Sequence, residues 1–401
     1  MEIIYESLCS MTAFRGILSL PVMASVVEFS KTLEEEEASD GEIINLYSEI
    51  FYRLSDSGFC DLGSYLSYHL KYDEGPYPRA VTDTEKDWLR SAALRDITIL
   101  KSLVDNCQEM KGALMQGVSP HLRDTLENLP EVIGGAICDL EELEEGYRRN
   151  GYGIYARGRA FLWDGYKVYL VKNPDALKFD EMTGYQWQRQ EVLKNTRALI
   201  EGASASNILL HGYSGTGKSA TVKSLIHIPE FYNLRIIEIA KSGMGKLRDL
   251  IRTLVGKRQK FILFIDDLSF SGEEEGYSAL KSVLEGGLGM RPDNVVVYAT
   301  SNRRHMVRES FGERQGDDVH VAETVQEKSS LADRFAIRIP YMALPKADFL
   351  KTVGNMALLE GIEIDTEELY ERANKWEIAH GGRTPRVARQ FIDYLLAECG
   401  R

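Results

Sequence analysis

The feature that most constrains the fold of this chain is a phosphate-loop motif at residues 212–219. It reads Gly-Tyr-Ser-Gly-Thr-Gly-Lys-Ser and matches the pattern G-x-x-x-x-G-K-[ST] at every position. An apolar run at 207–211 predicts a buried strand before it, and residues 220–226 predict a helix after it. In this order, glycines let backbone N–H groups turn toward phosphate oxygens, and the helix N-terminus adds its positive dipole end. The motif therefore predicts a nucleoside triphosphate site.

The motif also gives its residues individual roles. Lys218 is expected to reach the β- and γ-phosphates, and the Ser219 hydroxyl is expected to bind Mg²⁺. The other residues of the expected nucleotide-binding segment are Gly212, Ser214, Gly215, Thr216, Gly217 and Ala220. The alternative is a glycine-rich turn that opens an ordinary helix.

Composition and charge narrow the class of protein. A chain of 401 residues is longer than one hydrophobic core usually serves, so two or three domains are expected. The net charge of −13 argues against a surface that broadly attracts nucleic acid or anionic lipid. The five scattered cysteines predict reduced thiols in a cytoplasmic protein. No apolar run approaches the roughly eighteen residues of a membrane span, so no membrane association is expected.

The chain divides into four predicted regions. Residues 1–150 are mainly helical, with apolar residues at three- and four-residue spacing over 85–104 and again over 124–147. They contain no catalytic constellation, which favours a partner-binding or regulatory module. Residues 151–178 predict a β-hairpin linker around the turn Asp164-Gly165. The predicted nucleotide-binding domain covers 179–343, and a helical lid covers 344–401.

Short apolar runs alternate with helical patterns in the third region. They predict five strands, at 207–211, 234–239, 261–265, 295–299 and 335–339. This alternation is typical of an α/β fold with a mostly parallel, doubly wound sheet. Ligands in such sheets bind beyond the carboxyl ends of the strands.

Polar residues follow two of these strands. Asp266 and Asp267 end the run Phe261-Ile-Leu-Phe-Ile265, and Asn302 follows the run beginning at Val295. Asp266 is expected to hold Mg²⁺, and Asp267 to orient or deprotonate the attacking water. A neutral amide such as Asn302 can donate to phosphate or water and accept from another donor. The alternative for each site is a strand end capped by turn-forming polar residues.

The phosphate loop, acidic strand and Thr-Ser-Asn302 strand, in this order, resemble AAA+ ATPases. Segments 264–270, 299–305, 327–335 and 381–391 are similar to a bacterial AAA+ family of ATP-binding proteins whose function is unknown. The resemblance spans about 150–401. It implies an αβα domain with a five-stranded, mostly parallel sheet, a C-terminal helical lid, and ATP and Mg²⁺ as cofactors, with Asn302 as the sensor 1 residue.

The same resemblance assigns roles to three arginines. Arg334, in Asp333-Arg334-Phe335, matches an arginine finger that enters a neighbouring subunit's site, which implies a homo-oligomer, expected to be a ring. The alternative is an arginine that pairs with Asp333 or Glu327 to hold its loop. Arg383 matches the sensor 2 residue that reaches from the lid to the phosphates, with Arg386 as the second candidate. The alternative for Arg386 and Arg389 is a solvated helix face.

Two departures from the superfamily bear on mechanism. Asp267 stands where a glutamate is usual and is shorter by one C–C bond of about 1.5 Å, which predicts slow hydrolysis or a displaced water. The loop at 241–246 lacks the aromatic residue with which unfoldases grip a threaded chain, so threading is disfavoured.

A cluster of basic residues leaves a nucleic-acid partner open. It consists of Lys241, Lys246, Arg248, Arg252, Lys257, Arg258 and Lys260. These side chains can follow phosphates if they share one face, and a solvated helix surface is the alternative. We therefore expect an ATPase that remodels or loads a protein or nucleic-acid partner. The alternatives are a nucleotide-gated binding module with little turnover, and a kinase, for which no acceptor pocket is recognisable.

Overall fold

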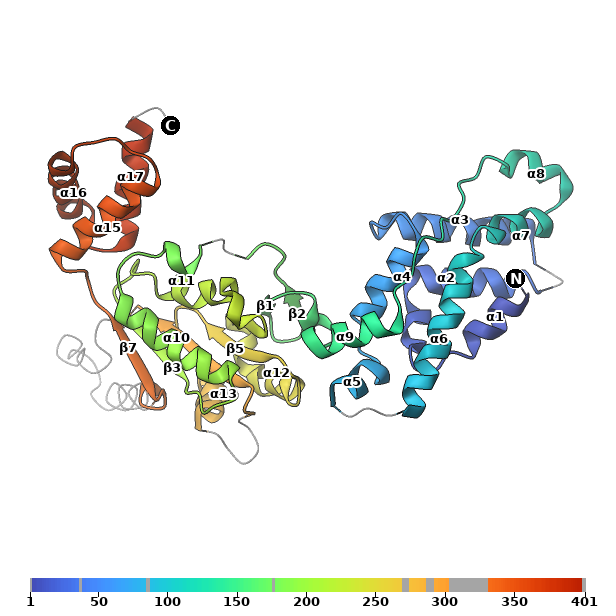
Figure 1. Cartoon of the computed structure of the whole chain (residues 1–401), viewed down its shortest axis with the longest axis horizontal. Helices are drawn as coiled ribbons and strands as arrows, with labels where there is room; N and C mark the ends of the chain where they lie inside the picture. Colours follow the sequence, from blue (N-terminus) through green and yellow to red (C-terminus); the bar gives the residue numbers. More distant parts are fainter. Residues whose placement is uncertain are drawn as a thin grey trace. The chain divides into compact units, whose positions relative to one another are not determined.

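The computed structural model describes residues 2–35, 38–83, 87–174, 177–268, 274–285, 292–302 and 331–398. The chain forms two compact units, Met1–Arg157 and Gly158–Arg401 (Figure 1). Arg303, Arg304 and Glu327, from the motifs quoted above, lie outside the described residues.

The first unit is built from helices around one core. Its buried side chains include Phe14, Phe29, Tyr47 and Tyr65, each at most 1% exposed. Amphipathic spacing explains why helices bury one face here. The elements are α1 (Glu2–Cys9), η1 (Arg15–Ser19), α2 (Pro21–Thr32), α3 (Asp40–Asp56), α4 (Leu62–Lys71), α5 (Pro76–Asp83), α6 (Asp87–Asp105), α7 (Glu109–Gly117), α8 (Pro120–Leu126), α9 (Leu140–Asn150) and η2 (Ile154–Ala156).

The helical pattern expected over 124–147 is interrupted. A non-helical segment at 127–139 separates α8 from α9. It contains Pro130, which has no N–H for a helical hydrogen bond. It also packs closely on the other helices, because a Cβ atom at Gly134 would lie 2.3 Å from the carbonyl oxygen of Val104. The prediction of one continuous helix was therefore wrong.

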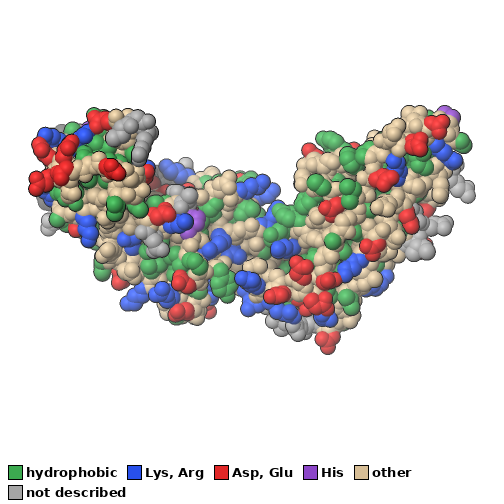
Figure 2. Space-filling model, turned by 45° about the horizontal axis from the view of Figure 1, so that its top comes forward, with side chains coloured by type: hydrophobic (Ala, Val, Ile, Leu, Met, Phe, Trp, Pro, Cys, Tyr) green, Lys and Arg blue, Asp and Glu red, His purple; other side chains and the backbone are tan. Residues whose placement is uncertain are grey.

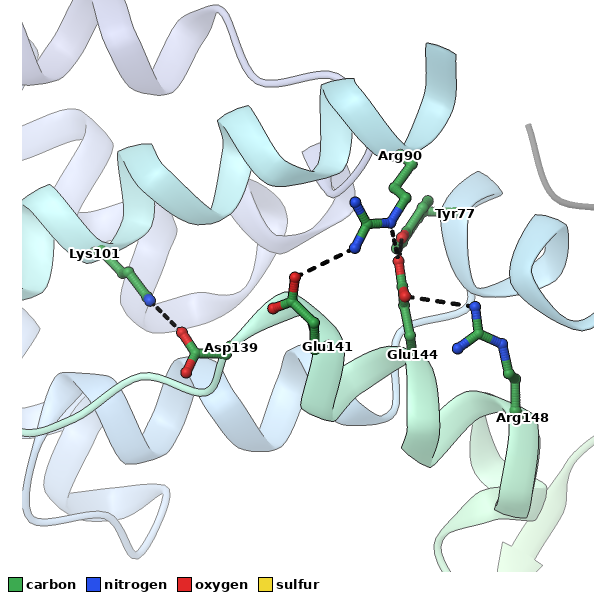
Figure 3. Close-up of polar contacts among 7 residues, drawn as sticks. All are labelled: Tyr77, Arg90, Lys101, Asp139, Glu141, Glu144 and Arg148. Atoms are coloured by element: carbon green, nitrogen blue, oxygen red, sulfur yellow. Dashed lines mark hydrogen bonds and ion pairs between the residues drawn. The ribbon is translucent and has the colours of Figure 1, made fainter. Parts of the chain in front are cut away.

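A buried carboxylate joins three helices of this unit (Figure 3). Glu144 of α9 accepts hydrogen bonds from the Tyr77 hydroxyl of α5 and, at 2.8 Å, from Arg90 Nε of α6. Arg148 Nη2 lies 3.4 Å from the other carboxylate oxygen. Burial alone would raise the pKa of Glu144, but the hydrogen bonds and the two guanidinium groups outweigh it and hold that pKa below its usual value.

The second unit contains one seven-stranded sheet in the order β2-β1-β4-β5-β6-β3-β7. All neighbouring strands are parallel except the pair β1 and β2. The runs from β3 to β6 are almost wholly buried, as expected for strands covered on both faces. The strands are β1 (Ala160–Trp163), β2 (Val168–Leu170), β3 (Ile208–Gly212), β4 (Leu234–Ile239), β5 (Lys260–Ile265), β6 (Val295–Ser301) and β7 (Ile337–Tyr341).

The predicted hairpin forms, but it extends the sheet instead of standing apart as a linker. Its first strand pairs in parallel with β4, in a register that matches Trp163 with Ile239. The sheet thus has two more strands than the five expected. Because β1 and β4 are parallel, the hairpin turn lies at the carboxyl edge of the sheet, where the phosphate loop also begins.

Helices cover both faces of the sheet, and the lid packs as a three-helix group (Figure 1). Because the connection from β3 to β4 runs across the sheet in the opposite direction to those from β4 to β5 and from β5 to β6, the right-handed crossover rule predicts α11 on one face and α12 and α13 on the other. This αβα arrangement with its helical lid confirms the predicted α/β fold class with a mostly parallel sheet. The elements are η3 (Phe179–Glu181), α10 (Gln186–Ile200), α11 (Lys218–Lys223), η4 (Ser224–His227), η5 (Pro229–Phe231), η6 (Lys241–Lys246), α12 (Leu247–Leu254) and α13 (Glu274–Glu285), with α15 (Lys346–Leu359), α16 (Thr366–His380) and α17 (Pro385–Glu398) in the lid.

Two further findings concern the described residues alone. No helix among them has both the length and the apolar character needed to cross a membrane. Their four cysteines, Cys9, Cys60, Cys107 and Cys138, are free thiols, and Cys399 lies outside the described residues.

Candidate nucleotide site

The phosphate-loop motif connects β3 to α11 and adopts a backbone that requires glycine. Gly212, Gly215 and Gly217 have φ angles of 134°, 73° and 88°, which L-residues rarely adopt. A Cβ atom at Gly212 would lie 2.1 Å from the carbonyl oxygen of Tyr341 on β7. Inside the loop, the Thr216 hydroxyl donates to the Tyr213 carbonyl at 2.8 Å. The glycines thus allow both the turn and its close contact with β7.

Lys218 opens α11 and is buried, with 5% of its surface exposed. Its Nζ donates to the carbonyls of Gly212 at 3.2 Å and Tyr213 at 2.6 Å, and to Asn302 Oδ1 at 3.0 Å. Burial lowers the pKa of this ammonium to about 8, and the nearby carboxylates of Asp267 and Asp266 oppose that shift. The lysine is therefore folded back over the loop, with its hydrogen bonds made to neutral oxygens.

Ser219 and Asp266 meet at the opening of the loop. The Ser219 hydroxyl donates to Asp266 Oδ1 at 2.5 Å, and the Thr300 hydroxyl donates to the same oxygen at 2.7 Å. Among the described residues no group of three or more His, Cys, Asp or Glu side chains lies close enough to hold a metal. One hydroxyl and one carboxylate still fit Mg²⁺, which keeps several waters and shares substrate phosphates.

Asp267 and Asn302 face each other beside this pair. Asn302 Nδ2 donates to Asp267 Oδ1 at 2.7 Å, while its amide oxygen accepts from Lys218. Asp267 has φ of 51°, an uncommon value for a residue with a side chain, and its N–H donates to the Thr300 hydroxyl at 2.9 Å. The side chain of Asn302 therefore lies between the ammonium and the second carboxylate.

The structure adds Thr300 to the residues expected from sequence. It is 2% exposed and is hydrogen-bonded both to the side chain of Asp266 and to the backbone of Asp267. In the sequence, Thr300 is recognisable only as the first residue of the polar triplet Thr-Ser-Asn302. A signal was present, because a hydroxyl two residues before Asn302 lies on the same side of a strand.

Two lid arginines differ in their contacts. The backbone N–H of Arg386 donates to the Gly215 carbonyl at 3.1 Å, and its Nη1 lies 3.4 Å from the Ser214 hydroxyl. Arg383 Nε lies 3.6 Å from Glu377, another residue of the lid. The structure thus brings Arg386 to the phosphate loop and holds Arg383 within the lid.

Arg334, the expected arginine finger, pairs within its own chain. Its guanidinium forms an ion pair with Glu285 at the end of α13. Asp333, one of the partners considered from sequence, pairs instead with Arg338 at 2.8 Å.

The cluster of basic residues from 241 to 260 does not form one stripe. Since β4 and β5 are parallel, residues 241–246 follow the carboxyl edge of the sheet, whereas 257–260 lie at its amino edge.

The solved structures that are similar to the chain have low sequence identity and low TM-scores. The chain is similar to the Thermotoga maritima RuvB Holliday junction branch migration motor, with 18% identity over 54% of this chain and 63% of that chain, and a TM-score of 0.38. It is also similar to C. elegans PCH-2, with 19% identity over 53% of this chain and 63% of that chain, and a TM-score of 0.36. In both cases the match spans less than two thirds of the neighbour's own length.

No curated protein matches the chain. The model of a family described as "Protein of unknown function (DUF815)" matches residues 156–399. This range agrees with the region over which the motifs resemble a bacterial AAA+ family of unknown function. The chain belongs to the DUF815 family.

Proposed function

We propose that the chain binds Mg²⁺-ATP and hydrolyses it. The observation that carries this proposal is the position of Asn302, whose amide accepts from the Lys218 ammonium and donates to the Asp267 carboxylate. A side chain between these two groups can sense the γ-phosphate and align the attacking water at once. A purely structural strand end does not require a buried lysine and a carboxylate joined by an amide that contacts both.

Each side chain has a distinct task in this reaction. Lys218 exchanges its bonds to the loop carbonyls for bonds to the β- and γ-phosphates. Ser219 and Asp266 would hold Mg²⁺, which would neutralise charge on the phosphates. Asp267 orients the water and accepts its proton as the water oxygen attacks the γ-phosphorus and the bond to the β-phosphate breaks. Arg386, already at the loop, contacts the phosphates from the lid.

The fold and Arg334 support a wider proposal. Arg334 acts on the ATP of a neighbouring subunit, so the working form is a homo-oligomer, proposed to be a ring. Hydrolysis is coupled to remodelling or loading of a protein or nucleic-acid partner. The free cysteines are consistent with the proposed cytoplasmic location.

Steady-state phosphate release, measured against protein concentration with and without Mg²⁺, tests this proposal. We expect specific activity to rise with concentration, to vanish in Lys218→Ala, and to fall about a hundred-fold in Asn302→Ala with ATP binding retained. Lys194→Ala, which removes an exposed lysine of α10, is the matched control and should be unchanged. Activity in Lys218→Ala equal to that of the unaltered protein would rule out this site.

One observation favours a second function, an ATP-dependent switch with little turnover. Asp267 is shorter than the usual glutamate, and its carboxylate is already hydrogen-bonded to Asn302. Tight ATP binding with negligible phosphate release at every protein concentration would support the switch over the hydrolase.

A further inference from the structure

The hairpin turn and the loop after β4 form one continuous surface at the carboxyl edge of the sheet. Trp163 Nε1 donates to the Gly243 carbonyl at 3.2 Å, and the Ser242 hydroxyl donates to the Asp164 carbonyl at 2.9 Å. The packing is close, because a Cβ atom at Gly243 would lie 2.7 Å from Trp163 Cδ1. We call residues 164–169 and 241–246 together the hairpin–loop surface.

This surface exposes aromatic rings beside lysines. The Tyr166 side chain is 81% exposed and Tyr169 is 45% exposed. Lys246 Nζ lies 3.4 Å from the centroid of the Tyr166 ring, and Lys167 Nζ lies 5.8 Å from that of Tyr169. The ammonium of Lys246 covers one face of the Tyr166 ring, and the large exposed fraction leaves the ring open to a ligand.

The charge of the surface is locally positive in an acidic chain. Lys167, Lys241 and Lys246 are exposed, and none has an ion-pair partner within the described part of the chain. The single acidic residue of the surface is Asp164, whose Oδ1 accepts the backbone N–H groups of Tyr166 at 2.7 Å and Lys167 at 2.8 Å. The hydrogen bond from the Lys167 N–H has the largest effect, and together the two bonds lower the pKa of Asp164 and direct its charge into the turn. Figure 2 shows Lys and Arg side chains gathered on the α/β core, whereas Asp and Glu are frequent on the lid.

We propose that the hairpin–loop surface binds single-stranded nucleic acid. A base stacks on the exposed face of Tyr166 and a neighbouring base on Tyr169, while the three lysines contact the phosphates between them. A duplex keeps its bases stacked on one another, so it cannot offer a free base to these rings. The sequence alone did not indicate this arrangement, because the aromatic residues lie more than seventy positions before the lysines of the loop. The inference names the partner class left open above and does not depend on ATP hydrolysis.

Fluorescence anisotropy of a short labelled single-stranded oligonucleotide of mixed sequence, with the full chain and no ATP, tests the proposal. We expect Tyr166→Ala to weaken binding about ten-fold and Tyr166→Phe to retain it. Lys246→Ala should weaken binding and reduce the slope of log affinity against log salt by about 0.7. Tyr232→Ala and Lys194→Ala, which remove an exposed tyrosine and an exposed lysine elsewhere on the same unit, are the matched controls.

Three results would overturn the proposal. The first is that the unaltered chain binds no oligonucleotide, and the second is that Tyr166→Ala binds as tightly as the unaltered chain. The third is that a duplex of the same length binds equally well. If a labelled unfolded polypeptide displaces the oligonucleotide and loses its own binding in Tyr166→Ala, the surface is a polypeptide site instead. Because no ATP is present, none of these outcomes depends on the proposed hydrolysis.

Discussion

Arg334 forms its ion pair inside its own chain, with Glu285 at the end of α13. The Arg334 side chain is only 25% exposed, and its Nε is buried without a hydrogen-bond partner in the described structure. An arginine that acts on a neighbouring subunit's ATP has to leave this pairing. In the proposed role of Arg334, Glu285 would therefore compete with the γ-phosphate for the same guanidinium.

Removing this competition should favour the active assembly. In Glu285→Gln we expect the protein concentration for half-maximal ATPase activity to fall by up to about five-fold, since a partly exposed ion pair contributes up to about 1 kcal/mol. Arg334→Ala should abolish the concentration-dependent activity. Phosphate release measured over a dilution series checks both. If Glu285→Gln loses activity as Arg334→Ala does, Glu285 supports the arginine instead of restraining it.

Thr300 should matter for turnover more than for nucleotide binding. In Thr300→Val, Asp266 loses a 2.7 Å hydrogen bond and the N–H of Asp267 loses its acceptor. Hydrogen bonds to charged groups contribute about 1.5–3 kcal/mol, so kcat should fall at least about ten-fold. Thr300→Ser keeps the hydroxyl and should restore most of the rate. Equal rates in the valine and serine variants would contradict this role.

Lys223 links β4 to the proposed magnesium site. Its Nζ lies 3.0 Å from Glu238 Oε2 and 3.8 Å from Asp266 Oδ2. A positive charge here repels Mg²⁺, so Lys223→Met should lower the Mg²⁺ concentration for half-maximal activity by about two- to five-fold. In Glu238→Gln the Lys223 ammonium loses its pairing with Glu238 and interacts more strongly with Asp266. The Mg²⁺ concentration for half-maximal activity should therefore rise. Magnesium titrations of ATPase activity test both variants. Shifts of the half-maximal Mg²⁺ concentration in the same direction for Lys223→Met and Glu238→Gln would contradict this role of Lys223.

The buried Glu144 should make the helical unit sensitive to acid. Its pKa is lowered in the folded chain, so its contribution to stability is complete above its unfolded value of 4.5 and is lost as pH falls through the lower folded value. At pH 7 we expect Glu144→Gln to reduce the free energy of unfolding by about 1–3 kcal/mol. As the pH falls below 4.5 and through the lower folded pKa, this difference should shrink, because the carboxylate of the unaltered chain becomes protonated.

Glu141 provides the matched control for this prediction. It is 72% exposed and also pairs with Arg90, at 3.3 Å. Glu141→Gln should change stability by less than about 0.5 kcal/mol at either pH. Urea unfolding of the full chain, followed by circular dichroism, measures all three proteins. An effect of Glu144→Gln that is the same at both pH values would exclude the carboxylate as its cause.

The local features of the nucleotide domain could be predicted from sequence. Phosphate loops depend on glycines and a lysine at fixed spacing, so the sequence alone identifies Lys218. Buried parallel strands are continuous apolar runs, so the strand before Asp266 is recognisable in the same way. The helix expected over 124–147 is not continuous, because the apolar periodicity of the sequence runs on across Pro130 and Gly134, although neither residue is helical. Those residues form a non-helical segment that packs against α6.

Long-range pairing could not be predicted in the same way. The turn at Asp164-Gly165 indicated a hairpin, but no local pattern shows that its first strand pairs with β4. For the same reason, no local pattern predicts the stacking of Lys246 on Tyr166. The sequence also could not distinguish Arg383 from Arg386, because the choice depends on how the lid packs on Gly215.

The contacts of Gly212 with Tyr341 and of Gly215 with Arg386 have a consequence for the order of synthesis. The phosphate loop leaves the ribosome well before β7 and α17, the elements that support its backbone. A nascent chain that ends short of α17 therefore carries the complete motif without the contacts that shape it. If the site binds nucleotide as proposed, binding should therefore await synthesis of β7 and the lid, and unfinished chains should not compete with complete ones for ATP.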